Sequence, residues 1–424
     1  MDYSKLSAEE LKELLQQEQK ELKKITKRGL TVDMTRGRPA KDQLEIAMPM
    51  LQRAGELDYA LKAGDARNYG QPQGVRPAME LFAEIFDVKP EEVIVADGSS
   101  LNIMYNVIQF AMQFGVLDNE PWNNQGKIKF ICPAPGYDRH FSICEKFGIE
   151  MITVPMTKTG PDMDVIEPLV ASDASIKGIW CVPKYSNPTG VTFSDKTVER
   201  IATMKVAAKD FRVFWDNAYA VHALYDTDDK LKNIFDVARK AGTIDRIYSF
   251  ASTSKITFGG SGVSAIAASE NNIKSLLKHM FFMTIGPNKV VQVMHVDFLK
   301  DLDNIKKIMK QHAAILRPKF ELFEKKFSEA FEGEEYVQWS KPRGGYFISV
   351  DVKGCAKRIV EIAASVDVKF TAAGSTFPYK LDDADSNIRI APSCPNLEEM
   401  DYAIDVLISA IKIAEIELQI KKKS

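Results

Sequence analysis

Lys255 is the residue whose surroundings in the sequence point most directly to chemistry. It follows an apolar stretch within SFASTSKITFGG (249–260), where its neighbours are small or apolar and no acidic residue stands beside it. Burial strips water from an ammonium group and lowers the pKa of its amine. An unprotonated amine is the nucleophile needed for a Schiff base with an aldehyde. Lys255 is therefore a candidate catalytic nucleophile, with a purely structural lysine as the alternative.

Polar residues follow three further apolar stretches. They are Ser99 and Ser100 in DGSS (97–100), Asn187 in YSNPTG (185–190), and Asp216 with Tyr219 in DNAY (216–219). A helix cap or a salt bridge is the plain alternative for the serines and for the aspartate. Ser99 and Ser100 also open an expected helix, whose unpaired N–H groups suit an anion. Because open α/β sheets bind ligands at the ends of their strands, the pattern predicts one shared site.

Short apolar strands are expected to alternate with helices through the middle of the chain. These elements would position the polar residues named above. Expected strands cover 92–96, 129–135, 151–156, 178–183, 212–216, 246–252 and 263–269, and expected helices cover 77–86, 99–116, 138–147, 163–171 and 194–208. Such alternation predicts an α/β fold with a mostly parallel central sheet that carries helices on both faces.

A smaller α+β domain is expected from the two ends of the chain. Residues 7–28 predict an amphipathic helix that Ser7 caps, with Glu10 completing a capping box. Charged helical sequence follows residue 297, then strands at 346–352 and 387–393 and a last helix at 397–418. We therefore expect a large domain at 50–300 and a small domain built from 1–49 and 301–424.

Composition excludes several other classes of protein. The 424 residues carry 56 Lys and Arg against 58 Asp and Glu, a formal net charge of −2, which gives no reason to expect a nucleic-acid partner. No apolar run is long enough for a membrane span, and the first residues lack an apolar region, so no signal peptide is expected. Five scattered cysteines predict no disulfide framework and favour the cytoplasm. The five histidines lack the spacing of metal ligands, so no metal site is expected. We expect all five, His140 included, to serve packing or solvent contact rather than catalysis.

Taken in order and spacing, these motifs, with RGGYF (343–347) and NIRIAPS (387–393), resemble the class I/II aminotransferases among the fold-type-I pyridoxal-phosphate enzymes. The resemblance runs from about Arg36 to Pro392. It implies pyridoxal 5′-phosphate as cofactor and Lys255 as its Schiff-base lysine. It also implies that Asp216 pairs with the pyridine nitrogen, so that the ring acts as an electron sink, while Tyr219 and Asn187 bond the ring's phenolic oxygen.

The same resemblance implies how the rest of the cofactor is held. Ser99, Ser100 and Ser252 would bind the phosphate, Tyr137 in PAPGYDRH would stack on the ring, and Tyr69 would reach the phosphate of a partner subunit, which makes the enzyme a homodimer with shared active sites. One position departs from the pattern. Val263 stands where most relatives carry a phosphate-binding arginine, eight residues after the lysine, and this resembles an aspartate aminotransferase subgroup that lacks that arginine.

Arginines are the expected substrate ligands. On a strand, the side chain of Arg389 points away from the face of Ile388 and Ile390 and needs a carboxylate partner, which in the family is the substrate's α-carboxylate. Gly37 resembles the small residue that lets this carboxylate approach the backbone. For the distal carboxylate of a dicarboxylic substrate, the candidates are Arg36, Arg38 and Arg139.

The expected activity is transfer of an amino group from an L-amino acid, aspartate, to a 2-oxo acid, 2-oxoglutarate. Alanine or aromatic donors are an alternative, as is a β-lyase or decarboxylase, which would use the same lysine and aspartate. A ligand-sensing domain of a transcription regulator is a further alternative. It is disfavoured because only about 30 residues, with one expected helix, precede TRGRP (35–39).

Overall fold

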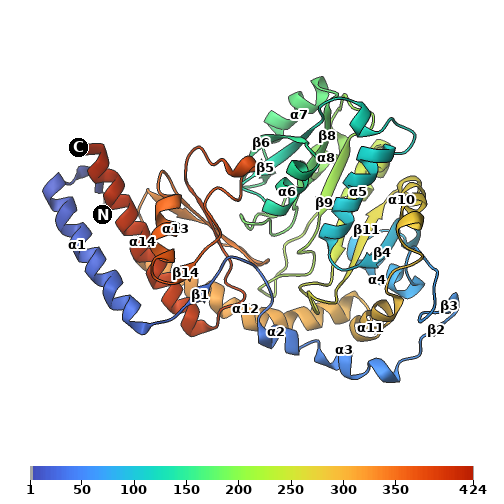
Figure 1. Cartoon of the computed structure of the whole chain (residues 1–424), viewed down its shortest axis with the longest axis horizontal. Coiled ribbons are helices and arrows are strands. Elements are labelled where there is room, and N and C mark those ends of the chain that lie inside the picture. Colours follow the sequence, from blue (N-terminus) through green and yellow to red (C-terminus); the bar gives the residue numbers. More distant parts are fainter. Residues whose placement is uncertain (1–2, 424) are drawn as a thin grey trace.

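A computed structural model describes residues 3–423. Its centre is an eight-stranded sheet (Figure 1). In spatial order the strands are β4 (Val93–Asp97), β11 (Val263–Ala268), β10 (Ile247–Ser252), β9 (Arg212–Asp216), β8 (Ile176–Cys181), β5 (Lys129–Ala134), β6 (Glu150–Thr157) and β7 (Gly160–Pro161). Strands β10, β9, β8, β5 and β6 are parallel, whereas β11 is antiparallel to both β10 and β4. The expected α/β fold with a mostly parallel sheet is therefore confirmed, with β11 and the edge strand β7 running against it.

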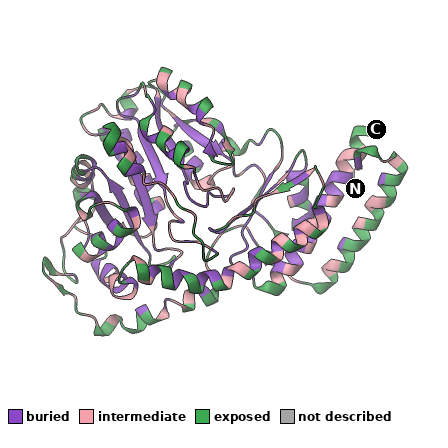
Figure 2. Ribbon diagram, turned by 180° about the vertical axis from the view of Figure 1, so that it is seen from behind, coloured by how far each residue is buried: buried purple, intermediate pink, exposed green. Residues whose placement is uncertain are grey.

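Helices cover both faces of this sheet. They are α4 (Arg76–Phe86), α5 (Ser100–Phe114), α6 (Asp138–Lys146), α7 (Met163–Ser172), α8 (Asp195–Thr203), α9 (Ile234–Ala241), α10 (Glu270–Met283) and α11 (Lys289–Leu299). Every residue of β9 is buried, and the strand feeds two hydrophobic cores: Val213 and Trp215 belong to one, Phe214 to the other. Because both faces of the sheet are buried, the sequences of the central strands are continuously apolar rather than alternating. Figure 2 shows these strands as the buried centre of the large sheet.

One expected helix is shorter than its sequence suggested. The apolar periodicity predicted a helix over 194–208, but α8 ends at Thr203. Met204 takes φ −53° and ψ 143°, outside the helical region, and is buried. Ala207 N–H then bonds the Val170 carbonyl. The contact with the neighbouring helix α7 replaces the last helical turn.

A second, antiparallel sheet of β12 (Val337–Trp339), β13 (Ile348–Val352) and β15 (Asn387–Ile390) lies apart from the first. Around it lie α12 (Leu302–Phe331), α13 (Ala356–Ala364), α14 (Leu397–Lys423) and α1 (Ala8–Ile25), and Figure 1 shows α1 beside α14 at one end of the molecule. The predicted capping box of α1 is confirmed, since Ser7 and Glu10 each accept a hydrogen bond from the other's backbone N–H.

Shorter elements connect these parts. Strand β1 (Val32–Asp33) pairs with β14 (Val368–Lys369), and β2 (Ala60–Leu61) pairs with β3 (Gly64–Asp65). Two short helices, α2 (Lys41–Glu45) and α3 (Met48–Gln52), lie along α12 and α11, and seven 3₁₀ turns occur within the described residues: 3–5, 26–28, 54–56, 90–92, 122–124, 244–246 and 378–380.

Helix α12 is common to both parts of the molecule. Ile305 and Met309 near its start pack with Leu81 and Ile256, while Phe323 and Phe327 belong to the core of the second sheet. A division at 50–300 against 1–49 plus 301–424 therefore stays a prediction; residues 1–2 and 424 of the second range lie outside the described chain.

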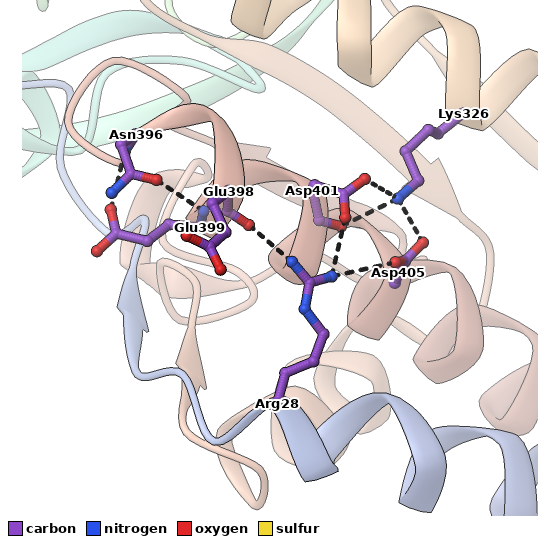
Figure 3. Close-up of polar contacts among 7 residues, drawn as sticks. All are labelled: Arg28, Lys326, Asn396, Glu398, Glu399, Asp401 and Asp405. Carbon is purple, nitrogen blue, oxygen red and sulfur yellow. Dashed lines mark hydrogen bonds and ion pairs between the residues drawn. The ribbon is translucent and has the colours of Figure 1, made fainter.

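An ion-pair network joins the N-terminal segment to the last helix (Figure 3). Arg28 donates to Asp401 at 2.8 Å and lies 3.7 Å from Asp405, and Lys326 of α12 reaches Asp405 at 2.6 Å and also binds Asp401. These side chains are partly exposed, so each pair contributes at most about 1 kcal/mol. The network fixes how α12 and α14 lie against the segment that leads into TRGRP.

Within residues 3–423, no helix combines the length and the apolar character that crossing a membrane requires.

Candidate active site

A cavity of about 480 Å³ lies where the carboxyl ends of β9 and β10 face the second sheet. It brings together nearly all the residues that the sequence singled out. Its lining includes Arg36, Gly37, Arg38, Ser99, Ser100, Tyr137, Arg139, Asn187, Asp216, Tyr219, Ser252, Lys255 and Arg389. Sheet topology explains the gathering, because Asp216 and Ser252 each end a parallel strand and Ser99 follows β4 at the same edge.

Asp216 carries a buried carboxylate into this cavity. Its side chain is only 3% exposed, and Oδ2 accepts a hydrogen bond from His140 Nε2 at 2.9 Å. Oδ1 is buried and has no hydrogen-bond partner among the described residues. A buried carboxylate oxygen without a donor is strongly destabilising. The position therefore calls for a ligand that brings an N–H or O–H group to Oδ1.

His140 is the functional neighbour that sequence reasoning missed. Packing or solvent contact was expected, and its ring does stack on Trp180 at 4.2 Å between ring centroids and 7° between planes. However, Nε2 also donates to Asp216, which fixes the tautomer and orients the carboxylate. The available signal was its spacing from Tyr137, since positions i and i+3 at the start of a helix face the same side.

Lys255 lies in the turn after β10 and lines the cavity. Its ammonium nitrogen is 5.3 Å from the centre of the Tyr219 ring. Burial lowers the pKa of Lys255 below its usual value, and the negative charge of Asp216 offsets part of that effect. The expected environment of a nucleophilic amine is thus present, with a carboxylate across the same cavity.

Aromatic rings form two walls of the cavity. Tyr219 is 3% exposed, and burial raises the pKa of its hydroxyl well above the usual value. Tyr137 directly precedes α6, and burial together with the charge of Asp216 raises its pKa to about 12. Both hydroxyls therefore stay protonated near neutral pH and can donate a hydrogen bond to a ligand. The Tyr137 ring contacts the edge of His140, which gives the cavity a flat aromatic side.

Serine hydroxyls gather at the end of the cavity next to α5. Ser99 precedes this helix with an extended backbone, yet its side chain makes no capping hydrogen bond within the described chain. A simple helix cap therefore does not account for this residue. The Ser252 hydroxyl donates to that of Ser254, 3.2 Å away, and both line the cavity together with Ser100. Hydroxyls and a helix N-terminus form a suitable anion site without any arginine.

Arg389 on β15 reaches the cavity from the second sheet. Its side chain is 5% exposed, and Nη1 lies 2.8 Å from Asp138 Oδ1 and 3.5 Å from Asn187 Oδ1. Gly37 lies nearby, where a Cβ atom would stand 2.6 Å from the Phe347 ring. A larger residue at position 37 would have to displace that ring, which lies beneath the Arg389 guanidinium at 5.0 Å.

Three more arginines line the cavity. Arg36 and Arg38 are exposed, and Arg139 on α6 is half-buried. No side-chain hydrogen bond or ion pair joins Arg36 or Arg139 to another residue of the described chain. These two guanidinium groups are therefore free to meet an anionic ligand.

Two positions lie outside the cavity. Tyr69, in the loop after β3, is 82% exposed and is not part of the lining. Val263 begins β11 and is 2% exposed, and its backbone N–H bonds the Thr253 hydroxyl. Its apolar side chain belongs to the hydrophobic core on one face of the sheet, so it offers nothing to a phosphate.

Comparisons with known proteins agree with this geometry. The sequence profile of a family described as aspartate amino-transferase matches residues 6–423. An aspartate aminotransferase of Corynebacterium glutamicum is 42% identical over 396 residues, which span 93% of this chain and 91% of that relative. The crystal structure of an aspartate transaminase from Corynebacterium glutamicum has a TM-score of 0.95 at 40% identity and covers 99% of both chains.

A more distant structure shares the fold. An α-aminoadipate aminotransferase from Thermus thermophilus, complexed with N-(5′-phosphopyridoxyl)-L-leucine, has a TM-score of 0.72 at 22% identity and covers 91% of this chain and 94% of that one. From the family profile and the close relatives, the chain belongs to the aspartate aminotransferase family and is an aminotransferase of pyridoxal-phosphate fold type I.

Proposed function

We propose that this chain binds pyridoxal 5′-phosphate in the cavity and transfers the amino group of L-aspartate to 2-oxoglutarate. The observation that carries the proposal is the unpartnered Oδ1 of buried Asp216 in the same cavity as the Lys255 amine. A protonated pyridine nitrogen supplies the missing donor, and an aldehyde suits the amine. The groups present therefore fit the cofactor at two chemically distinct ends.

The remaining lining residues fit the other parts of the cofactor. Ser99, Ser100, Ser252 and the N-terminus of α5 would hold the phosphate. Tyr137 would stack on the ring, and Tyr219 and Asn187 would bond its phenolic oxygen. The resemblance and the chemistry of these donors support the assignments, with hydroxyls and N–H groups replacing the arginine absent at position 263.

Pyridoxal phosphate, when bound, supplies an electron sink for the electron pair left on the substrate Cα when its proton leaves. Asp216 would keep the ring nitrogen protonated, and the hydrogen bond from His140 orients the Asp216 carboxylate for this role. Nζ of Lys255 takes the proton from Cα as a general base, for which an amine of lowered pKa is suited. Arg389 binds the α-carboxylate and so fixes which bond of Cα faces the sink.

Aspartate and 2-oxoglutarate each carry a second carboxylate, which needs a cation of its own. Arg139 is the strongest candidate because it is half-buried and lies two residues from Tyr137; Arg36 is next, and Arg38 third. The aspartate aminotransferase from Corynebacterium glutamicum at 42% identity supports the same substrate class. Alanine or aromatic donors remain the alternative substrates, and a β-lyase or decarboxylase the alternative reaction.

The active form in this proposal is a homodimer, in which Tyr69 reaches the partner subunit's phosphate site. Lys289 Nζ holds the carbonyls of Asn68 and Gly70 at 2.7 and 2.9 Å, so the loop is fixed although Tyr69 is exposed. Beside it, Gly286 packs against Gly70, next to a group of exposed apolar side chains. These are Phe281, Phe282, Met283 and Ile285, with exposed fractions of 62%, 89%, 52% and 60%. A second copy of the chain would cover this apolar patch.

The covalent step gives the first prediction. When the ligand-free chain reacts with pyridoxal phosphate, adduct formation should have its midpoint below pH 10.5, the usual lysine pKa, because burial lowers the pKa of Lys255 and less hydroxide is needed to free its amine. Borohydride reduction and peptide mapping measure where the adduct lies. It should be on Lys255 and absent from Lys255→Arg. A phosphopyridoxyl group on another lysine would reject the assignment.

Substrate choice gives the second prediction. Arg139→Ala should raise KM for aspartate at least about tenfold more than KM for alanine, because a buried distal carboxylate would lose its partner. Arg36→Ala is measured in parallel, and Arg200→Ala is the control, because it breaks partly exposed ion pairs with Asp164 and Glu167 outside the cavity lining. An amino-donor screen with 2-oxoglutarate comes first. A wild-type preference of tenfold or more for alanine or an aromatic donor would end the dicarboxylate proposal while leaving amino transfer intact.

Assembly gives the third prediction. Phe282→Glu should shift the protein from dimer to monomer in sedimentation equilibrium, because it places a charge in the apolar patch. The same variant should bind pyridoxal phosphate more weakly, since the partner subunit's Tyr69 would be missing. Leu381→Glu, at a position 65% exposed in the loop before β15, is the matched control and should stay dimeric. A Phe282→Glu protein that remains a dimer would show that the interface lies elsewhere.

A further inference from the structure

Asp138 forms an ion pair with Arg389 inside the cavity, and the proposed function gives this pair no role. The two residues are 251 positions apart: Asp138 begins α6 of the large sheet's layer, and Arg389 lies on β15 of the second sheet. Asp138 Oδ1 is 2.8 Å from Nη1. The guanidinium assigned to the substrate's α-carboxylate therefore already holds a carboxylate of the chain itself.

The other N–H groups of Arg389 offer the substrate carboxylate few alternatives to Nη1. Nη2 donates to the Thr371 hydroxyl at 3.3 Å, and Nε is buried without a partner in the described part of the chain. One face of the guanidinium lies over the Phe347 ring. A carboxylate that binds in two-point fashion needs two neighbouring N–H groups of the fork. Because Nε is buried, the pair formed by Nε and Nη2 is out of reach, and the carboxylate is left with Nη1 and Nη2. It must therefore take Nη1 from Asp138 or place a second negative charge beside it, which like-charge repulsion disfavours.

The two partners of the pair differ in how easily they move. The Arg389 side chain is 5% exposed and is held by Thr371 and Asn187 as well, so it stays in place. The Asp138 side chain is 30% exposed and stands in the first turn of the nine-residue helix α6. Water and the positive end of the helix stabilise a carboxylate there after it leaves Arg389. When a substrate carboxylate binds, Asp138 is therefore the residue that moves away from the pair.

We propose that Asp138 is a resident competitor for Arg389 that sets the affinity of the enzyme for its carboxylate substrates. This inference rests on the proposed role of Arg389. While Asp138 holds Nη1, the fork is closed to substrate, so the apparent affinity is reduced by the fraction of molecules in that state. Both half-reactions use an α-carboxylate, so the effect falls on the amino acid and the 2-oxo acid alike. The same competition favours departure of the product.

If Asp138 instead orients Arg389 for the substrate, removing its charge should weaken substrate binding rather than strengthen it. A variant without that charge therefore distinguishes competition from orientation. In holoenzyme carrying Asp138→Asn, competition predicts that KM for aspartate and for 2-oxoglutarate both fall, by roughly five- to tenfold, and that kcat/KM rises. An orienting role predicts that KM rises or that kcat/KM falls. Asp164→Asn, which removes an aspartate from an exposed pair with Arg200, is the matched control and should change neither constant.

A binding measurement tests the same point without turnover. Calorimetric titration of the holoenzyme with succinate, which has no amino group to transfer, should give a Kd roughly five- to tenfold lower in Asp138→Asn than in the wild type. Asp138→Ser serves if the asparagine variant does not fold. Arg389→Gln should lose succinate binding.

The outcomes are distinguishable. Tighter binding in Asp138→Asn with loss of binding in Arg389→Gln supports the competition. Unchanged or weaker binding in Asp138→Asn, with Arg389→Gln still deficient, overturns the competition and leaves the proposed function standing. Retained binding in Arg389→Gln overturns both, because Arg389 would then not be the carboxylate ligand.

Discussion

Asp216 brings a carboxylate into a cavity where one of its oxygens is buried and accepts no hydrogen bond from the described chain, and the neighbouring groups are arranged around that oxygen. His140 binds the other oxygen and is itself held flat against Trp180, so the carboxylate cannot turn away. Burial lowers the pKa of Lys255, and the negative charge of Asp216 opposes that shift. A pyridine nitrogen that bonds Oδ1 keeps its proton, and amino transfer depends on that proton.

The second sheet completes the site by supplying what the large sheet lacks. The parallel strands end in Asp216 and Ser252, which suit a cofactor, whereas Arg389 on β15 and Gly37 in the N-terminal segment suit a substrate carboxylate. Asp138 connects the two halves, because it starts α6 next to Tyr137 and holds Arg389 across the cavity. The network of Arg28, Lys326, Asp401 and Asp405 fixes the outer side of the same N-terminal segment. The residues that suit the cofactor and those that suit the substrate are therefore in contact through a few side chains.

Much of this arrangement could be predicted from the sequence, because it depends on local pattern. The apolar run RVFWD became β9 with its bounds unchanged, and Asp216 and Lys255 lie in one cavity because the ends of parallel strands meet at one edge of a sheet. Arg389 reaches the same cavity from β15 of the second sheet. What could not be predicted depends on pairs far apart in the chain. The His140–Asp216 and Asp138–Arg389 contacts join residues 76 and 251 positions apart. Local spacing can indicate which side of a helix His140 faces, but not which distant residue it contacts. The early end of α8 has the same origin, since a contact with α7 outweighed helix propensity.

The protonation state of the ring nitrogen tests the account most directly. Holoenzyme reconstituted with pyridoxal phosphate labelled with ¹⁵N in the ring reports that state by NMR across a pH series. If Asp216 holds the proton as its buried, unpartnered oxygen implies, the nitrogen stays protonated from about pH 6 to about pH 9. The Asp216→Asn variant should lose that protonation. A wild-type nitrogen that titrates within this range, or is unprotonated throughout it, would contradict the account.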